Sequence, residues 1–513
     1  MTMKVIDLFS GPGGLGEGFA SLENGSAFHI GVSAEMDSAA HSTLTLRAFF
    51  RLAKKSGDRK ALQSYYAFCN SPEGAHPCVS DPLLWEAARQ EARQLTLGDP
   101  ASNETLDKII ANQKLGGDDT ILIGGPPCQA YSLVGRARNS GKVGYVPEDD
   151  HRHYLYRQYL RIVGKTRPAA FVMENVKGIL SSTVGGRRIF HDILTDLRDP
   201  VHATTGKRGP RYVIYSLSTD TKFDEGMDPA DLDPRDFIVK AEEYGIPQAR
   251  HRVILLGIRE DIAVTSTRLR KKNQVTVRNA LFGIPALRSG LSKGDSPTEW
   301  AARISKIGVK MAQDARASDM NEIAESLSSV CSSIDPGLQS GALRFPKHGY
   351  EPSSVEPSSF SHWVADARVK VWLNHVARPH MDSDLGRYLY ASVYASVTGR
   401  SPRGHAEFAL PDLAPAHANW KSGKFVDRFK VQRFDQPSST ITSHISKDGH
   451  YFIHPDPKQC RSLSVREAAR LQTFPDNYFF QGGRTQQFHQ VGNAVPPLLA
   501  YRIAATVRRI TSR

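Results

Sequence analysis

The stretch Val5-Ile6-Asp7-Leu8-Phe9-Ser10-Gly11-Pro12-Gly13-Gly14-Leu15-Gly16-Glu17-Gly18-Phe19 decides the fold. Its first five residues are typical of a buried strand, the glycines of a tight turn, and its last three of the start of a helix. A second apolar stretch, residues 29–34, predicts another strand, which ends at Glu35. A strand, a glycine turn, a helix and a strand ending in an acid are typical of a nucleotide-type site in a parallel sheet.

Further along the chain the same rhythm continues. Residues 120–123, 169–173 and 252–257 are apolar runs that predict buried strands, with helical stretches between them. Strands that alternate with helices predict an α/β protein with a doubly wound, mostly parallel sheet. The first domain is predicted to span residues 1–265, and residues 38–97 to form a helical insertion within it.

The remainder of the chain predicts a second, smaller domain and a return to the first. Residues 266–457 are rich in Ser, Arg and His and lack the strand–helix alternation. From residue 458 the pattern becomes regular again, and Ser464 to Glu467 form a capping box that opens a helix. Residues 458–513 are therefore expected to pack against the first domain.

Composition excludes several classes. The 513 residues are 23% charged and 40% hydrophobic, which excludes a disordered chain. No run of eighteen apolar residues predicts a membrane span, the start lacks a signal core, and five scattered cysteines predict neither disulfides nor zinc. A cytosolic protein is expected. The net charge of +13 makes nucleic acid a plausible partner, and residues 135–188 hold eleven Lys and Arg against four Asp and Glu.

Three features could carry chemistry. Cys128 follows Pro126 and Pro127 at a strand end, where open α/β sheets place ligands, although a lone cysteine in a stiff turn can be purely structural. Glu174 ends a buried strand and could be an acid or a helix cap. Arg250 and Arg252 lie on one face of a strand start, where they suit a carbonyl or carboxylate or are merely solvated. The glycine turn alone leaves NAD, FAD and S-adenosylmethionine open.

Taken in order, these segments resemble the DNA (cytosine-5) methyltransferases of bacterial restriction–modification systems. The matching segments are Asp7 to Gly14, Gly-Gly-Pro-Pro-Cys-Gln (124–129), Glu-Asn-Val (174–176), Gln-Ala-Arg-His-Arg (248–252), 466–475 and Gln-Val-Gly-Asn-Ala-Val (490–495). The resemblance covers roughly 1–37, 98–265 and 437–513. It does not reach residues 38–97 and is loose across 266–436.

The resemblance implies a fold, a reaction and a cofactor. The fold is that of S-adenosylmethionine-dependent methyltransferases, and the reaction methylates cytosine carbon 5 in a specific duplex DNA sequence, with the base flipped out of the stack. Cys128 would be the nucleophile, Glu174 would act at ring N3, Arg252 would hold the cytosine carbonyl, and Arg250 would support it. No metal is required.

Cofactor and DNA residues are implied in the same way. The S-adenosylmethionine site would comprise Phe9, Gly11, Gly13, Gly14, Leu15, Glu35, Met36, Asp99, Pro127, Leu155, Asn493 and Val495. Met36 replaces an aromatic residue found in some members, and Pro100 beside Asp99 replaces an isoleucine. The DNA contacts would be Gln129, Ser132, Arg136 and Arg138, in a loop over residues 129–144 that closes on the substrate.

Residues 266–457 would then be the target-recognition domain. Its cluster of His375, Arg378, His380 and Arg387 could contact phosphates or bases, could include a His/Asp metal site, or could lie at solvated helix ends. The implied setting is the cytoplasm of a bacterium, at the nucleoid, where a monomer protects host DNA. A cognate restriction endonuclease would be a functional partner and not a stable subunit.

Three other functions are considered. A tRNA cytosine-5 methyltransferase shares the same segments, although the long 266–457 region favours DNA. A catalytically silent DNA-binding homologue is disfavoured by the intact Cys128, Glu174 and Arg252. A nicotinamide-dependent enzyme is supported only by the glycine turn and Glu35, and gives the Pro-Pro-Cys-Gln segment no role.

Overall fold

The fold was derived from a computed structural model, which describes residues 2–127, 153–184, 186–347, 359–415, 420 and 428–511. Contacts within the chain divide it into two units. The first unit comprises Met1–Tyr65, Ala75–Asn273 and Ala494–Arg513, and the second comprises Tyr66–Gly74 and Gln274–Asn493.

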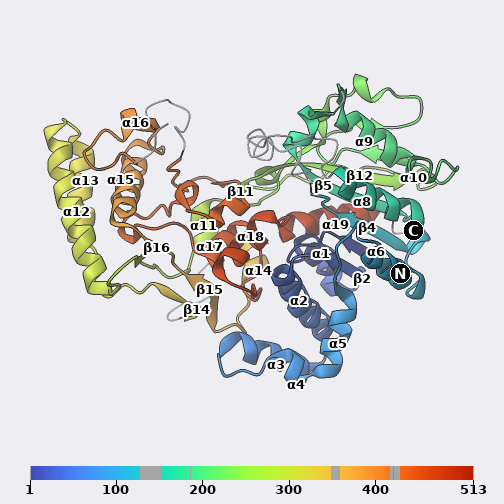
Figure 1. Ribbon diagram of the computed structural model, residues 1–513, viewed down its shortest axis with the longest axis horizontal. Coiled ribbons are helices and arrows are strands. Elements are labelled where there is room, and N and C mark those ends of the chain that lie inside the picture. The colour runs from blue at the N-terminus through green and yellow to red at the C-terminus, as the bar shows by residue number, and fades with distance from the viewer. Residues whose placement is uncertain are drawn as a thin grey trace. The chain divides into compact units, whose positions relative to one another are not determined.

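A nine-stranded sheet forms the centre of the first unit (Figure 1). The strand order is β3-β2-β1-β4-β5-β12-β8-β9, with β10 also paired to β12. The strands are β1 (Met3–Leu8), β2 (Phe28–Glu35), β3 (Ala92–Gln94), β4 (Thr120–Gly124), β5 (Ala170–Val176), β8 (Tyr212–Tyr215), β9 (Lys222–Phe223), β10 (Ile238–Lys240) and β12 (His251–Arg259). Strands β3 to β5 in this order are parallel, whereas β12 runs antiparallel to β5, β8 and β10. The predicted α/β class and mostly parallel sheet are confirmed.

Helices cover both faces of this sheet. They are α1 (Gly14–Ala20), α2 (Ser38–Ser56), α4 (Pro77–Ser80), α5 (Pro82–Glu91), α6 (Pro100–Asn112), α8 (His153–Thr166), α9 (Ile189–Arg198), α10 (Pro200–Thr205) and α19 (Pro497–Thr511). Helix α1 packs on α19 so closely that a Cβ on Gly18 would lie 2.4 Å from the Ala500 Cβ. The core between sheet and helices includes Ile6, Leu122 and Phe171, each fully buried.

Buried ion pairs fix α1, which follows the glycine turn, to the next helix. Glu17 of α1 accepts a 2.8 Å hydrogen bond from Nε of Arg47 on α2, and both side chains are almost fully buried. The two arginines Arg47 and Arg51 hold the pKa of the Glu17 carboxyl at about 2 against the opposing effect of burial. A buried charge of this kind is stable only because it is paired.

The stretch 38–97 differs from the predicted helical insertion. It is mainly helical, but Ala92–Gln94 form β3, which pairs in parallel with the end of β2. Helices α2 and α5 pack on each other and on the sheet, so this stretch extends the α/β layers. Helix α3 (Arg59–Asn70) crosses the boundary, because its last residues belong to the second unit. There the Phe68 carbonyl accepts a 2.8 Å hydrogen bond from Arg344.

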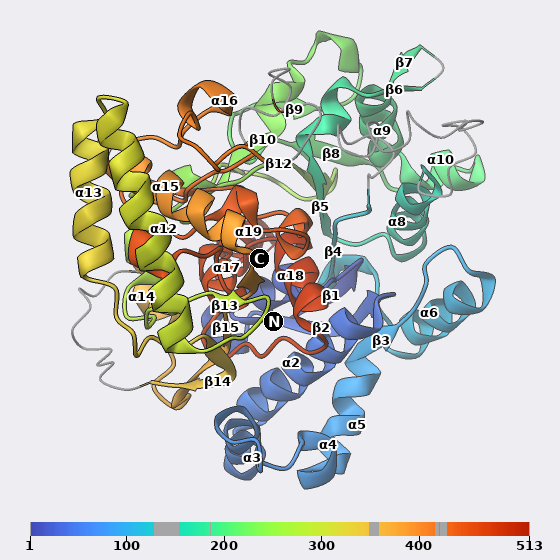
Figure 2. The same ribbon diagram turned by 60° about the vertical axis from the view of Figure 1, so that its left-hand side comes forward.

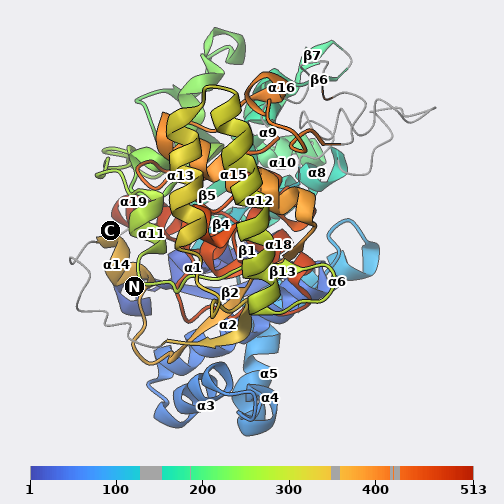
Figure 3. The same ribbon diagram turned by 90° about the vertical axis from the view of Figure 1, so that its left-hand side faces the viewer.

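Three long helices stand side by side in the second unit, as Figures 2 and 3 show. They are α12 (Pro297–Ala317), α13 (Asn321–Ser332) and α15 (Asp382–Thr398), and they bury Trp300, Leu327 and Leu389. The unit also contains α11 (Val277–Leu281), β13 (Gly290–Leu291), β14 (Gly341–Pro346), α14 (Ser359–Val364), β15 (Val371–Val376), β16 (Pro379–His380), α16 (Gly404–Glu407), α17 (Val465–Leu471) and α18 (Arg484–Asn493). Strands β14 and β15 form an antiparallel hairpin.

The boundary near the C-terminus also differs from the predicted one. Ser464 caps α17 through the expected capping box with Glu467. However, α17 and α18 belong to the second unit, and the chain returns to the first unit only at Ala494. The reason lies in Arg466, which is fully buried and donates to the carbonyls of Leu373 and Pro475. The bond to Leu373 joins α17 to strand β15 of the hairpin that precedes it.

Candidate active site at the strand ends of the first unit

The glycine turn leaves β1 with an unusual backbone. Phe9, Gly11 and Gly13 have φ angles of 56°, 56° and 98°, in the left-handed region that favours glycine. Gly14 begins α1, and a Cβ there would lie 2.2 Å from the Val495 carbonyl oxygen. No described atom lies within 4 Å of the place that a Cβ on Gly11 would take. The turn therefore packs tightly against residue 495 while its Gly11 side is unobstructed within the described part of the chain.

Glu35 at the end of β2 reaches this turn. Its carboxylate accepts hydrogen bonds from the backbone N–H groups of Gly11 at 2.7 Å and Asp37 at 2.8 Å. Burial raises the pKa of Glu35, and these two backbone hydrogen bonds oppose the increase. Next to it, Met36 is 59% exposed. The turn and the acid that the sequence predicted to share a site are thus in direct contact.

The remaining predicted cofactor residues are more widely placed. Asp99 is exposed and caps α6 by accepting a hydrogen bond from the Ser102 N–H, which lowers the pKa of its carboxyl. Leu155 is half-buried in α8, and Leu15 is buried in α1. Asn493 ends α18 in the second unit, whereas Val495 lies in the first. Of the last two residues, only Val495 belongs to the same unit as the glycine turn.

Glu174 and Arg252 form an ion pair at the carboxyl end of β5. Nε of Arg252 lies 3.0 Å from Oε1 of Glu174, and both side chains are largely buried. Burial lowers the pKa of Arg252, and the Glu174 carboxylate opposes this effect. Arg250 is 2% exposed, and burial together with Arg252 holds its pKa well below its usual range. The three side chains that the sequence placed in one site therefore belong to one electrostatic cluster.

The segment that directly precedes Cys128, residues 124–127, lies beside Glu174. Gly124, the last residue of β4, pairs with Met173 of β5. A Cβ on Gly125 would lie 3.1 Å from Oε2 of Glu174, and the Asn175 side-chain amide donates to the Pro126 carbonyl at 3.3 Å. Pro127 is the last residue described before the gap. Cys128 and the predicted DNA contacts Gln129, Ser132, Arg136 and Arg138 lie outside the described residues.

The sequence assigned no role to three residues around this cluster. Asn175 was quoted only as part of a segment, although it ties the loop before Cys128 to β5. Glu242 and Lys177 flank the ring of His251, next to Arg252. No spacing rule signals these contacts, because they join residues that the sheet topology brings together.

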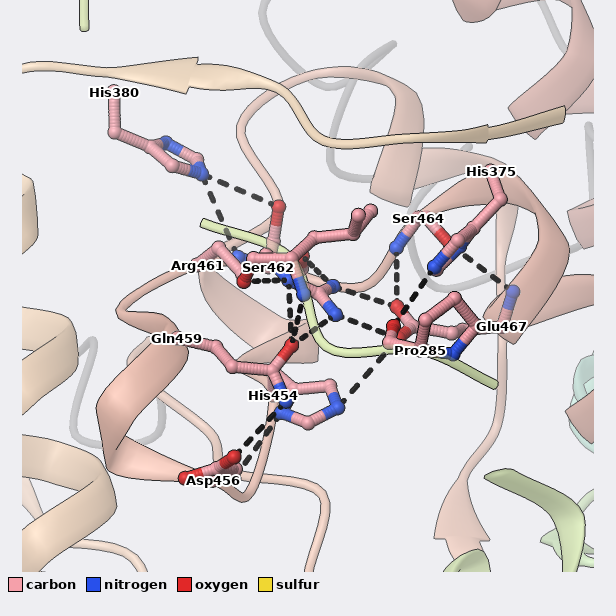
Figure 4. Close-up of polar contacts among 11 residues, drawn as sticks. Pro285, His375, His380, His454, Asp456, Gln459, Arg461, Ser462, Ser464 and Glu467 are labelled. Carbon is pink, nitrogen blue, oxygen red and sulfur yellow. Dashed lines mark hydrogen bonds and ion pairs between the residues drawn. The ribbon is translucent and has the colours of Figure 1, made fainter. Parts of the chain in front are cut away.

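The structure places three residues of the predicted DNA-contacting cluster in the interior, His375 and His380 (Figure 4) together with Arg387, whereas Arg378 is half-buried. His375, His380, Arg378 and Arg387 were expected to reach phosphates or bases, or to be solvated. His375 is fully buried between the Ser464 hydroxyl and the Pro285 carbonyl, and burial lowers its pKa to about 4. His380 is also buried, and the two arginines donate to backbone carbonyls, Arg378 to Ile445 and Arg387 to Leu413.

His375 and His380 belong to a larger polar network that includes Ser462 and Ser464. Arg461 is fully buried and makes two hydrogen bonds to Glu467, at 2.6 and 2.7 Å. His454 approaches the same carboxylate at 3.5 Å (Figure 4). Arg461 and the histidines hold the pKa of Glu467 at the low end of its range despite burial. Within the described ranges no three His, Cys, Asp or Glu side chains form a group that could hold a metal ion.

The fold and the strand-end residues define a methyltransferase of the α/β class, and comparison with known proteins identifies the family. The model of the C-5 cytosine-specific DNA methylases matches residues 100–200 and 235–509. The chain belongs to this family and is a DNA (cytosine-5-)-methyltransferase. The family assignment excludes the nicotinamide-dependent alternative.

Similar proteins span the whole chain. The Type II methyltransferase M.Bpa9945I of Bacillus paralicheniformis is 32% identical over 99% of both chains. The Type II methyltransferase M.AgeI of Thalassovita gelatinovora is 26% identical, again over 99% of both. The crystal structure described as a DNA modification methyltransferase encoded within an E. coli prophage covers 100% of both chains with a TM-score of 0.55 and 20% identity, which supports the fold. No helix in the described ranges is long and apolar enough to cross a membrane.

Proposed function

We propose that this chain transfers a methyl group from S-adenosylmethionine to carbon 5 of a cytosine in a specific duplex DNA sequence. The observation that carries the proposal is the Glu174–Arg252 pair, which lies at the strand end beside the loop to Cys128. In a member of the C-5 cytosine methylase family, this pair stands where a cytosine ring would be held.

The residues around the glycine turn fit the cofactor. Glu35 ends β2 and already fixes the Gly11 N–H, so its carboxylate lies where ribose hydroxyls would be bound. Met36 is exposed and offers an apolar surface to an adenine ring, and the exposed carboxylate of Asp99 suits its amino group. Phe9, Gly13, Gly14, Leu15, Pro127, Leu155, Asn493 and Val495 complete the proposed site. S-adenosylmethionine, when bound, supplies an electrophilic methyl group.

The protein's task is to make carbon 5 of cytosine a nucleophile. The Cys128 thiolate forms a bond to carbon 6, while a proton held between Glu174 and ring N3 compensates the charge that develops on the ring. Arg252, fixed by Glu174, orients the cytosine carbonyl, and Arg250 supports it. Carbon 5 would then take the methyl group as its bond to sulfur breaks and S-adenosylhomocysteine is left; the carbon 5 proton would leave to a base, and the bond between carbon 6 and Cys128 would break to restore the ring and the thiolate.

This chemistry requires a base outside the DNA stack. A cytosine in a duplex exposes neither face of its ring, so we propose that the base is flipped out. The positive charge of residues 135–188 supports phosphate contacts next to the active site, and we assign these contacts to Gln129, Ser132, Arg136 and Arg138. Residues 266–457 supply the sequence recognition, through side chains other than the buried His375, His380 and Arg387.

The biological role follows from the relatives. Because similar proteins are Type II methyltransferases, we propose that the chain protects bacterial DNA from a cognate restriction endonuclease. The endonuclease would act on the same sequence without forming a stable complex. The chain would work as a monomer on DNA in the bacterial cytoplasm, at the nucleoid.

Methyl transfer to two substrates tests the proposal. Purified protein is incubated with methyl-labelled S-adenosylmethionine and either bacterial genomic DNA or total tRNA. Label is expected in the DNA as 5-methylcytosine and not in the tRNA. Label in the tRNA alone would favour the tRNA alternative, and tight DNA binding without any transfer would favour the silent homologue.

A further inference from the structure

The ring of His251 is held from both sides at the edge of the proposed cytosine site. Its Nε2 atom lies 2.6 Å from Oε1 of Glu242, and its Nδ1 atom lies 3.5 Å from Nζ of Lys177. Glu242 lies in η7 (Ala241–Glu243), which follows β10, and Lys177 begins η4 (Lys177–Ser181), directly after β5. The two partners therefore lie in short helices that follow the two strands paired with this end of β12, which are β10 and β5.

These two partners orient the His251 ring. A carboxylate can only accept a hydrogen bond, so Nε2 is the nitrogen that donates to Glu242. Nδ1 faces the Lys177 ammonium on the other side. The ring is thus held between two charged side chains in one orientation.

The backbone of His251 contacts the catalytic pair. Its carbonyl oxygen accepts a 2.9 Å hydrogen bond from Nη1 of Arg252, whose Nε atom binds Glu174 at 3.0 Å. The Arg252 guanidinium is therefore fixed at two points, and one of them is the peptide group of residue 251. The remaining N–H groups are those available to a cytosine carbonyl.

This peptide group lies where the ladders of β12 end. His251 is the first residue of β12, and its pairing with Lys240 is the last in the β10–β12 ladder. On the other side, the β5–β12 ladder ends one residue later, with Arg252 opposite Val176. The backbone before it is held by the Ala241 N–H, which donates to the Arg250 carbonyl at 3.0 Å, and the contacts of the His251 ring add a side-chain restraint at the same point.

We propose that Glu242 is a positioning residue for methyl transfer: by accepting the His251 Nε2 proton, it fixes the peptide that holds Arg252 against Glu174. Glu242 itself does not touch the substrate. This inference rests on the proposed function, because it concerns the orientation of the arginine assigned to the cytosine carbonyl.

The neighbouring acid provides a matched control. Glu243 lies in the same short helix, but its carboxylate pairs with Lys271 at 2.9 Å and with Lys240 at 3.8 Å, and His251 acts on it only as a weaker, more distant charge. Loss of Glu243 removes the same charge from the same turn and leaves the His251 ring in place. A difference between the two variants reports the contact with His251 and not the charge of η7.

The test compares Glu242→Ala, Glu242→Gln and Glu243→Ala in the full chain. The substrate is a duplex that carries the sequence in which bisulfite sequencing finds methylation. Glu242→Ala is expected to lower kcat about tenfold or more, because a displaced catalytic group costs turnover, while the Kd for S-adenosylmethionine stays within about twofold. Glu242→Gln should retain kcat within about threefold, since its amide oxygen accepts the same hydrogen bond. Glu243→Ala should match the unaltered chain.

A spectroscopic readout makes the result independent of turnover. In protein labelled with nitrogen-15 histidine, the His251 signal, assigned with His251→Gln, should show a protonated Nε2 engaged in a hydrogen bond, and Glu242→Ala should lose this signature. An unchanged signature or an unchanged kcat in Glu242→Ala would overturn the inference, as would equal loss in Glu242→Gln. If the unaltered chain shows the signature but transfers no methyl group, the proposed function fails and the positioning role fails with it.

Discussion

Nε of Arg252 lies 3.0 Å from Oε1 of Glu174. The same guanidinium donates a second hydrogen bond, from Nη1, to the carbonyl oxygen of the preceding residue, His251. The pair joins β12 to the end of β5, next to the loop that leads to Cys128. The proposed mechanism needs both bonds to Arg252, and this requirement gives the first prediction.

Arg252→Lys should lower kcat by about 100-fold while binding of S-adenosylmethionine is unchanged. A lysine ammonium is a point charge on a flexible stem and cannot bind Glu174, the residue 251 carbonyl and a substrate carbonyl in the fixed geometry of a guanidinium. Steady-state methylation of a duplex and calorimetric titration with the cofactor measure the two quantities. Near-normal kcat in this variant would contradict the role of Arg252.

Glu35→Ala should weaken cofactor binding by at least about tenfold. The substitution removes the acceptor of two backbone N–H groups, those of Gly11 and Asp37, and with it the carboxylate proposed to bind the ribose hydroxyls. Glu35→Gln should be intermediate, because its side chain offers only one acceptor oxygen. Calorimetric titration with S-adenosylmethionine measures the Kd. The control is Glu23→Gln, which changes a half-exposed acid of the same unit. Equal Kd values in the unaltered chain and the three variants would exclude Glu35 from the site.

Asp7→Asn should stabilise the protein at neutral pH and above. Asp7 is fully buried at the end of β1, and burial raises its pKa from 3.8 to about 7. An acid whose folded-state pKa is raised costs stability as pH rises from the unfolded value to the folded one, here from about 4 to 7, by about 1.4 kcal/mol per pH unit. The variant lacks this titration, so its advantage over the unaltered chain should grow across that window and level off above it.

Chemical unfolding of both proteins at pH 5, 6, 7 and 8 measures this difference. Comparing the two chains cancels the opposite contributions of His375 and His454, whose pKa values are lowered to about 4. A difference in the free energy of unfolding that does not change with pH would show that Asp7 does not titrate in this range.

DNA binding should weaken steeply with salt. Each phosphate contact adds about 0.9 to the slope of log affinity against log salt concentration, so removing both arginines in Arg136→Ala/Arg138→Ala should reduce the slope by about 2. Fluorescence anisotropy with a labelled duplex at several salt concentrations measures it. Lys55→Ala, an exposed lysine of α2, should leave the slope unchanged, and an unchanged slope in the double arginine variant would remove these residues from the interface.

Apolar runs located the central strands because those strands are buried on both faces. Residues 120–123 and 252–257 fall within β4 and β12, and Ser464 caps its helix as expected. Strand β3 escaped detection because Ala92–Gln94 carry no apolar run and become a strand only by pairing with β2. The pairing joins residues that lie far apart in the chain and so could not be predicted from the local sequence.

The site shows the same contrast. The strand-end positions of Glu35 and Glu174 could be predicted, since parallel strands end at one edge of a sheet. The burial of His375 and Arg387 could not be predicted, because polar residues are normally solvated and here carbonyl groups accept their hydrogen bonds in the interior. The chain returns to the first unit at Ala494 and not at the predicted residue 458, and the buried Arg466, which donates to the Leu373 carbonyl, joins α17 to the second unit.

Bisulfite sequencing of DNA from a bacterial host that expresses this chain tests the central claim most directly. A host expressing the unaltered chain should show one protected cytosine within one recurring sequence, and a host expressing Cys128→Ser at equal level should show none. Protection that persists in the Cys128→Ser host would contradict the covalent mechanism. The absence of any protected cytosine with folded, unaltered protein would contradict the proposed methylation itself.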